Sequence, residues 1–97
     1  VAAEKNSVRL LTENGSRVID RKRLKIIQTP QVFPAASLKK AYQTCYDPAY
    51  TDDACVAEKQ GISILLVEGE ESNFKITTPF DWIVAECWYH HFVKTTE

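Results

Sequence analysis

One apolar run limits the folds open to this chain more than any other feature. Residues 62–67 read Ile-Ser-Ile-Leu-Leu-Val, so nearly all of the run is β-branched or leucine. A short run of this kind that follows a helical stretch is typical of a strand buried on both faces. Such a strand needs neighbouring strands and cover on each side, so the sequence predicts an α/β sheet.

Local signals predict further elements around this run. Residues 7–20 read as a hairpin with its turn at Asn14-Gly15, and a short buried strand follows at Leu24 and Ile26-Ile27, ending at Thr29-Pro30. Two helices come next, and another short strand covers residues 74–77. The helical signals are Pro34, Leu38, Ala41, Tyr42 and Cys45 up to Asp47-Pro48, then residues 53–60 with Thr51 or Asp52 as the cap and Gly61 as the terminator.

The start of the last helix is the best local signal. Thr78 stands at the cap, Pro79 at the first helical position and Asp81 three residues after the cap. Apolar side chains then recur at helical spacing to about Val93. They are Phe80, Ile83, Val84, Cys87, Trp88 and His91. The whole order of elements resembles the back half of an α/β sheet and not a closed fold.

Composition excludes several classes of function. The net charge is −1, and although Arg17 to Lys25 holds five basic residues in nine, the neighbouring acids cancel this patch, so we expect no nucleic-acid partner. No apolar run approaches the roughly 20 residues that a membrane span requires. We therefore expect no membrane partner either.

The cysteines and histidines predict neither a disulfide framework nor a metal site. Cys45, Cys55 and Cys87 are odd in number and lack a C-x-x-C spacing, so we expect buried thiols on helices in a reducing cytoplasm. The adjacent His90 and His91 point about 100° apart on a helix and have no ligand partner at metal spacing. We expect Trp82 and Trp88 to pack in the core and interface.

The chain opens at Val1 and contains no methionine. We therefore expect it to be processed or to be a piece of a longer protein. The opening residues also lack a basic segment followed by an apolar one, which would indicate a secretory signal.

Three segments carry a family resemblance. The first is Asp20-Arg21 followed by Gln28-Thr29-Pro30-Gln31-Val32-Phe33, and the second is Thr51-Asp52-Asp53-Ala54. The third is Val67-Glu68-Gly69 with Asn73-Phe74-Lys75-Ile76-Thr77-Thr78-Pro79 and Asp81. In this order and spacing the chain resembles the methylerythritol-phosphate cytidylyltransferase family.

The resemblance implies the C-terminal portion of a nucleotide-diphospho-sugar-transferase-like (Rossmann-like) α/β sheet. Residues 1–24 would form an extended β-arm hairpin for dimerisation, and residues 25–97 the substrate side. The family joins CTP to 2-C-methyl-D-erythritol 4-phosphate with Mg²⁺, releases pyrophosphate, and acts as a homodimer whose arm completes the partner's site. The CTP-binding glycine-rich loop of its N-terminal half has no match here, so we expect no turnover from these residues alone.

The resemblance also implies roles for individual residues. Lys75 matches the lysine near the reacting phosphates, and we expect it to be catalytic. Arg21 matches the arm arginine that meets the substrate phosphate in the partner's site. Phosphate donors and cleft residues complete the predicted set. They are Thr29, Thr51, Asp52 and Ser7 for the sugar phosphate, and Glu68 and Gly69 as lining of the same cleft.

One departure from the family pattern affects Ser7. The family usually has D-T-x-K where this chain has Asn6-Ser7-Val8-Arg9, so the hydroxyl and the cation survive and the aspartate does not. Two alternatives stay open. The acceptor could be ribitol 5-phosphate, because the related cytidylyltransferase shares these motifs, or the chain could be a non-catalytic dimerisation fragment.

Overall fold

The structure, a computed structural model, describes residues 1–96, with side chains described through Lys94. It is a mixed α/β chain. Its elements are β1 (Ala2–Ala3), β2 (Val8–Thr12), β3 (Gly15–Ile19), the 3₁₀ turn η1 (Arg21–Arg23), β4 (Lys25–Ile26), α1 (Ala35–Ala41), α2 (Asp53–Lys59) and α3 (Pro79–Thr96).

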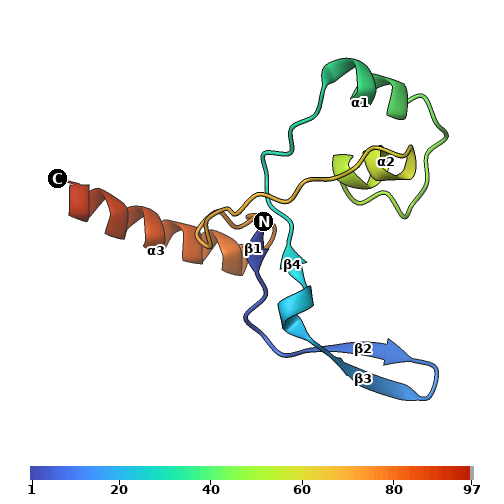
Figure 1. Cartoon of the computed structure of the whole chain (residues 1–97). Helices are drawn as coiled ribbons and strands as arrows, with labels where there is room; N and C mark the ends of the chain where they lie inside the picture. Colours follow the sequence, from blue (N-terminus) through green and yellow to red (C-terminus); the bar gives the residue numbers. More distant parts are fainter. Residues whose placement is uncertain (97) are drawn as a thin grey trace.

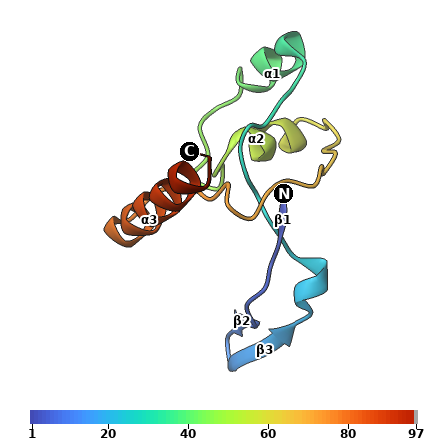
Figure 2. The same ribbon diagram turned by 90° about the vertical axis from the view of Figure 1, so that its left-hand side faces the viewer.

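The chain spreads into three lobes that meet near β1. Figure 1 shows the β2–β3 hairpin, the α1–α2 pair and the single helix α3 extending in different directions, and Figure 2 shows the same separation from the side. The radius of gyration is 17.3 Å, whereas a compact domain of this length would have about 13 Å. Much apolar surface is therefore left uncovered by the chain itself.

The predicted hairpin is confirmed. Strands β2 and β3 pair antiparallel from Val8 opposite Ile19 to Thr12 opposite Gly15. Gly15 has a φ of 141°, which explains why glycine follows the turn. The hairpin stands apart from the other lobes, so Leu11 is 83% exposed.

Strand β1 lies between two segments. It pairs antiparallel with β4, Ala2 opposite Ile26. On its other side, the Val1 amine donates to the Val67 carbonyl at 2.8 Å and the Gly69 N–H donates to the Val1 carbonyl at 2.8 Å. This alternation of bonds, with Val1 opposite Glu68, is the pattern of a parallel pair. The strand predicted near Ile26 is therefore confirmed, although Ile26 and Ile27 are exposed and not buried.

The two later strand predictions are wrong for the described chain. Residues 62–67 and 74–77 form no strand ladder among the described residues. Leu65 is 87% exposed, although the sequence predicted burial on both faces. The physical reason is that a strand exists only with a partner strand: within residues 1–96, the run bonds at its ends only the end of α2, through Ile62, and Val1, through Val67.

Helices α1 and α2 form the small core. Its buried residues are Ala41 of α1 with Val56 and Ala57 of α2. Helix α1 ends at Ala41, earlier than predicted, because the Thr44 hydroxyl donates to the Ala41 carbonyl at 3.2 Å and takes up an end group of the helix.

Helix α2 has the predicted limits. Asp52 is its cap, since the Asp52 Oδ1 accepts from the Cys55 N–H at 2.8 Å, and Gly61 follows its end with a φ of 86°. Thr51, the other predicted cap, instead places its hydroxyl 3.3 Å from the Cys55 thiol.

Helix α3 begins as predicted. The Asp81 N–H donates to the Thr78 Oγ1 at 3.1 Å, and the Asp81 Oδ2 accepts from the Thr78 N–H at 3.0 Å, which makes a reciprocal capping box. The Thr77 N–H and hydroxyl also donate to the Asp81 Oδ2, and these two donors, with Thr78 after them, lower the pKa of the Asp81 carboxyl. The helix runs to Thr96, beyond the predicted end at Val93.

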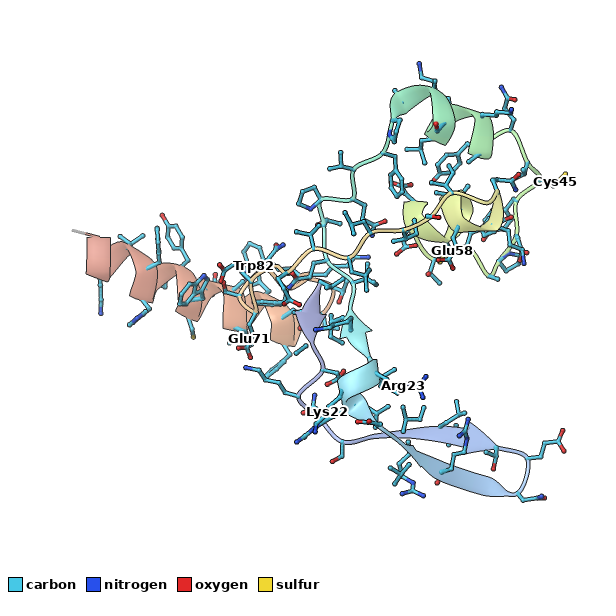
Figure 3. The ribbon with its side chains drawn as sticks, viewed as in Figure 1. Lys22, Arg23, Cys45, Glu58, Glu71 and Trp82 are labelled. Atoms are coloured by element: carbon cyan, nitrogen blue, oxygen red, sulfur yellow. The ribbon has the colours of Figure 1, made fainter. Side chains whose placement is uncertain are left out.

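Side chains predicted to be buried are exposed on and near the helices. Trp82 is 57% exposed, and Trp88 is exposed as well, because α3 projects away from the other elements (Figure 3). Cys87 on α3 and Cys45 in the loop after α1 are exposed free thiols, and Cys55 of α2 is half-buried. No helix within residues 1–96 combines the length and apolarity that crossing a bilayer requires.

Candidate functional site

A hollow of about 540 Å³ lies where β1, the segment after β4, the start of α2 and residues 71–75 meet. Four of the predicted site residues line it: Thr29, Thr51, Asp52 and Lys75. They come from three segments that are distant in the sequence. The structure therefore brings together the residues that the resemblance assigns to one phosphate-handling site.

Thr29 is held through its backbone. It follows β4, and its carbonyl accepts a hydrogen bond from the Asn73 side-chain amide at 2.7 Å. A second clamp lies beside it, where the Gln28 Nε2 donates to the Glu70 carbonyl at 2.6 Å. These two bonds fix the segment after β4 against residues 70–73, and they hold Thr29 at the wall of the hollow.

Thr51 and Asp52 form the opposite wall at the start of α2. Hydrogen bonds from Cys55, above all from its backbone N–H, lower the pKa of the Asp52 carboxyl, and the Gln31 amide adds to this shift. Asp52 is thus an anionic cap whose oxygens are engaged with donors of the protein. Thr51 is the exposed hydroxyl next to it.

Lys75 supplies the cation of the hollow. It lies on an extended stretch and is exposed, whereas the preceding Phe74 is half-buried. Among the described residues, no hydrogen bond or ion pair engages the Lys75 ammonium group. A free ammonium group next to two threonines is a suitable set of donors for phosphate oxygens.

The sequence prediction missed an ion pair at the edge of the hollow. Lys5 Nζ lies 2.6 Å from Glu71 Oε2, and both residues line the hollow (Figure 3 labels Glu71). The two residues are 66 positions apart, and neither stands in a motif, so no local signal could have revealed the pair. Gln31 and Asn73, which also line the hollow, stood inside motifs but were given no role.

The other predicted residues do not line this hollow. The Arg21 Nη1 donates to the Lys5 carbonyl at 2.9 Å, so its guanidinium group lies just behind the Lys5 side of the hollow. Ser7 follows the lining residue Asn6 and precedes β2.

The positions of Glu68 and Gly69 differ most from the sequence prediction, which placed both residues in the cleft with the sugar-phosphate residues. Glu68 pairs instead with Lys25, with 3.3 Å between Oε1 and Nζ. At Gly69, a Cβ atom would lie 2.3 Å from the Gln28 Oε1 and 3.3 Å from the Val1 carbonyl oxygen. The absent side chain therefore permits close packing of the backbone against Gln28, which accounts for glycine at this position.

The described residues do not fit a metal ion held by this chain. Asp52 and Glu71 line the hollow, yet within residues 1–96 no three His, Cys, Asp or Glu side chains gather as ligands. The Asp52 oxygens are also occupied by amide donors, and Glu71 is paired with Lys5. We assign no chemical step to Mg²⁺ through these residues.

Comparisons with known proteins identify the family. The family model for 2-C-methyl-D-erythritol 4-phosphate cytidylyltransferase matches residues 9–91. A curated relative of that name from Bacteroides fragilis is 53% identical over 81 residues, which are 84% of this chain and 37% of that protein. Another from Nostoc punctiforme is 38% identical over 96 residues and covers 95% of this chain and 40% of that protein.

A solved structure shares the arrangement of the elements. The crystal structure of 2-C-methyl-D-erythritol 4-phosphate cytidylyltransferase from Thermus thermophilus matches with a TM-score of 0.73 and 30% identity, over 89% of this chain and 44% of that one. The chain thus spans well under half of the length of these relatives. On the family model, the sequence identities and the shared fold, the chain belongs to the 2-C-methyl-D-erythritol 4-phosphate cytidylyltransferase family.

Proposed function

We propose that these residues form the sugar-phosphate side of an enzyme that transfers a cytidylyl group from CTP to 2-C-methyl-D-erythritol 4-phosphate and releases pyrophosphate, a step of non-mevalonate isoprenoid synthesis. One observation carries the proposal. Thr29, Thr51 and Lys75, from three separate segments, line one hollow. Membership of the family supplies the reaction.

The chemistry explains why these groups suit the hollow. A phosphate oxygen of the acceptor attacks the α-phosphorus of CTP, and the bond from that phosphorus to the bridging oxygen breaks as pyrophosphate leaves. Both reactants are anions, so the protein must offset their charge and hold them in line. Thr29 and Thr51 would donate to the acceptor phosphate, and Lys75 would offset the charge that accumulates in the transition state.

We assign the remaining predicted residues to the border of this site. Arg21 would bind the acceptor phosphate in a partner copy, with Ser7 beside it on the same arm. Glu68 and Gly69 would hold the strand next to Val1 and support the cleft indirectly. Mg²⁺ would enter with CTP and be held by parts of the enzyme outside these residues.

The larger architecture is part of the same proposal. Residues 1–24 would be a dimerisation arm and residues 25–97 the substrate-side portion of a Rossmann-like sheet. The parallel bonding between Val1 and residues 67–69 supports a sheet of this kind, and the exposed apolar residues of the hairpin, Leu11 and Val18, support a homodimer. Three free cysteines suit the cytoplasm.

A chimera tests the reaction. These 97 residues replace the matching residues of the Bacteroides fragilis relative, and pyrophosphate release is measured with CTP and each polyol phosphate. We expect turnover with 2-C-methyl-D-erythritol 4-phosphate and none from the 97 residues alone. An inactive chimera, beside an active intact relative, contradicts the proposal. Faster turnover with ribitol 5-phosphate would reassign the acceptor.

A mixed dimer tests the arm. Arg21→Ala and Lys75→Ala chimeras are each purified, then mixed, unfolded and refolded together. If Arg21 acts in the partner's site, heterodimers regain one intact site, up to about a quarter of all sites in a random mixture, and activity rises above either variant alone. Activity that stays at the sum of the two separate variants would place Arg21 in its own subunit's site.

A further inference from the structure

Both ends of the Gln31 side-chain amide are engaged at the start of α2. The Nε2 donates to the Asp52 Oδ2 at 3.3 Å, and the Oε1 accepts from the Ala54 N–H at 3.1 Å. Gln31 is half-buried and lines the hollow. A glutamine suits this place because it alone offers a neutral donor and a neutral acceptor on one planar group of this length.

These two bonds solve two separate problems at the helix start. The Ala54 N–H belongs to the first turn of α2, so it has no acceptor within the helix. The Asp52 carboxylate uses Oδ1 for the Cys55 N–H, which leaves Oδ2 for Gln31. The Gln31 amide therefore fixes the orientation of the Asp52 carboxylate. It also provides an acceptor for the Ala54 N–H.

The same bonds connect the two walls of the hollow. Gln31 lies two residues after Thr29, and Asp52 lies directly after Thr51. Within residues 1–96, Gln31 is the only side chain whose hydrogen bonds join the segment after β4 to the start of α2. The Gln31 amide is thus the hydrogen-bonded link between the segments that carry Thr29 and Thr51.

We propose that Gln31 is a positioning residue for the sugar-phosphate subsite, which sets the spacing of Thr29 and Thr51 by linking the segment after β4 to Asp52 and Ala54. The inference rests on the proposed function, because it names how that site is assembled. Gln31 acts through its neighbours and takes no part in bond making. Its loss should weaken binding of the acceptor phosphate and leave CTP binding and the chemical step nearly unchanged.

Substitutions in the active chimera test this assignment. Gln31→Leu keeps the size of the side chain and removes both hydrogen bonds. We expect the KM for 2-C-methyl-D-erythritol 4-phosphate to rise about tenfold, while kcat and the KM for CTP stay within about twofold. Gln60→Leu, the same change at the exposed other end of α2, is the matched control and should leave all three constants unchanged.

Gln31→Glu provides a readout that a loss of folding would not imitate. The new carboxylate can still accept from the Ala54 N–H, but it faces the Asp52 carboxylate, so the link is lost when both are ionised and regained when they share a proton. We expect the KM ratio of this variant to the parent to fall toward one between about pH 8 and pH 5.5, whereas the ratio for Gln31→Leu stays constant.

Because each KM is divided by the KM of the parent at the same pH, the titration of all other groups cancels in the ratio. The titratable groups that line the hollow are Glu4, Lys5, Asp52, Glu71 and Lys75, with Asp53 and Cys55 beside them on α2. All of these, and the substrate phosphate, are common to the parent and the variants. Only the pair formed by residue 31 and Asp52 differs.

The outcomes separate this inference from the proposed function. An inactive parent chimera contradicts the function, whereas an active parent with an unchanged KM in Gln31→Leu, or a Gln31→Glu ratio that does not vary with pH, overturns the role of Gln31 alone. In the double variant with Asp52→Ala, the effect of Gln31→Leu should shrink, because the two residues act as one unit. Full additivity would also overturn the assignment.

Discussion

Helices α2 and α3 begin alike and lie in opposite surroundings. Each start is fixed by an aspartate: the Asp52 carboxylate precedes α2 and accepts from the Cys55 N–H of its first turn, whereas the Asp81 carboxylate lies in the first turn of α3 and accepts from the Thr78 N–H before it. Helix α2 then packs on α1 and buries Val56 and Ala57, whereas α3 projects with its aromatic side chains exposed (Figures 1 and 3). Capping decides where a helix begins, and packing has to come from elsewhere.

The two helices also differ in what they contribute to the hollow. Helix α2 carries Thr51 and Asp52 at its start and is already packed on α1, so this wall of the hollow is built within these residues. Helix α3 has a large apolar surface and no residue of the hollow. Its large apolar side chains therefore stay mostly exposed within the described residues.

Replacing Lys75 should have the largest effect, a fall in kcat. It contrasts a lysine of the hollow with a lysine of α3. In the active chimera, Lys75→Ala should lower kcat about 100-fold, because it removes the cation that we propose offsets charge on the transferred cytidylyl group, and change the KM for CTP less. Lys94→Ala, at an exposed lysine near the end of α3, is the control and should keep parental rates. Equal rates in the two variants would remove Lys75 from the chemistry.

A pair of valines tests the difference in packing. In the 97-residue chain, kept in solution by a Leu65→Lys substitution, Val56→Ala on α2 should lower the free energy of unfolding by about 2 kcal/mol, since Val56 is only 4% exposed. Val84→Ala on α3, where valine is 37% exposed, should cost about 0.5 kcal/mol or less. Urea unfolding followed by circular dichroism measures both.

Repeating the two valine substitutions in the chimera tests whether α2 and α3 still differ in packing within the larger protein. If α3 is covered there, Val84→Ala should approach the cost of Val56→Ala. A cost that stays small in the chimera would mean that α3 remains uncovered in the whole enzyme.

Gly69→Ala probes the segment between the two helices. The new methyl group would press on the Gln28 side chain, which can move only by giving up its bond to the Glu70 carbonyl. We expect a loss of about 1 kcal/mol in the free energy of unfolding of the chimera, the usual worth of one hydrogen bond. In a Gln28→Ala background, where this bond is already absent, Gly69→Ala should cost little more, and a cost that persists would implicate the Val1 carbonyl instead.

Protonation of the aspartates at the two helix starts should have the smallest effect on stability, and it can be followed by lowering the pH. The pKa values of Asp52 and Asp81 are lowered in the folded chain, so their contribution is present above about pH 4 and is lost as pH falls through the folded pKa values. The amide resonances of Cys55 and Asp81 should report these transitions in an NMR titration. Asp52→Asn and Asp81→Asn should each abolish the transition at its own helix and leave the other.

The parts predicted well from sequence are those set by neighbouring residues. The Thr78–Asp81 capping box, Gly61 after α2 and the hairpin turn at Gly15 all depend on contacts within a few positions. The strand prediction for residues 62–67 failed because a ladder depends on a distant partner. Helix α1 ended early because the Thr44 side chain competes for an end carbonyl.

The site was predictable to the extent that motifs carried it. Thr29, Thr51, Asp52 and Lys75 were named from the resemblance, and the structure gathers them around one hollow. The contact between Lys5 and Glu71 joins residues 66 positions apart, so no spacing rule could indicate it. Glu68 and Gly69 were placed near the right segment, but only coordinates reveal that they support Val1 and Lys25.

The exposed run at residues 62–67 has a practical consequence. It is six residues long, apolar apart from Ser63, without charge or proline, and its backbone lacks a ladder within the described chain. Segments of this kind recruit identical copies into intermolecular β-structure, which leads to aggregates and inclusion bodies. Expression of these residues alone should therefore give insoluble material unless a solubilising fusion or a Lys substitution at Leu65 blocks that self-pairing.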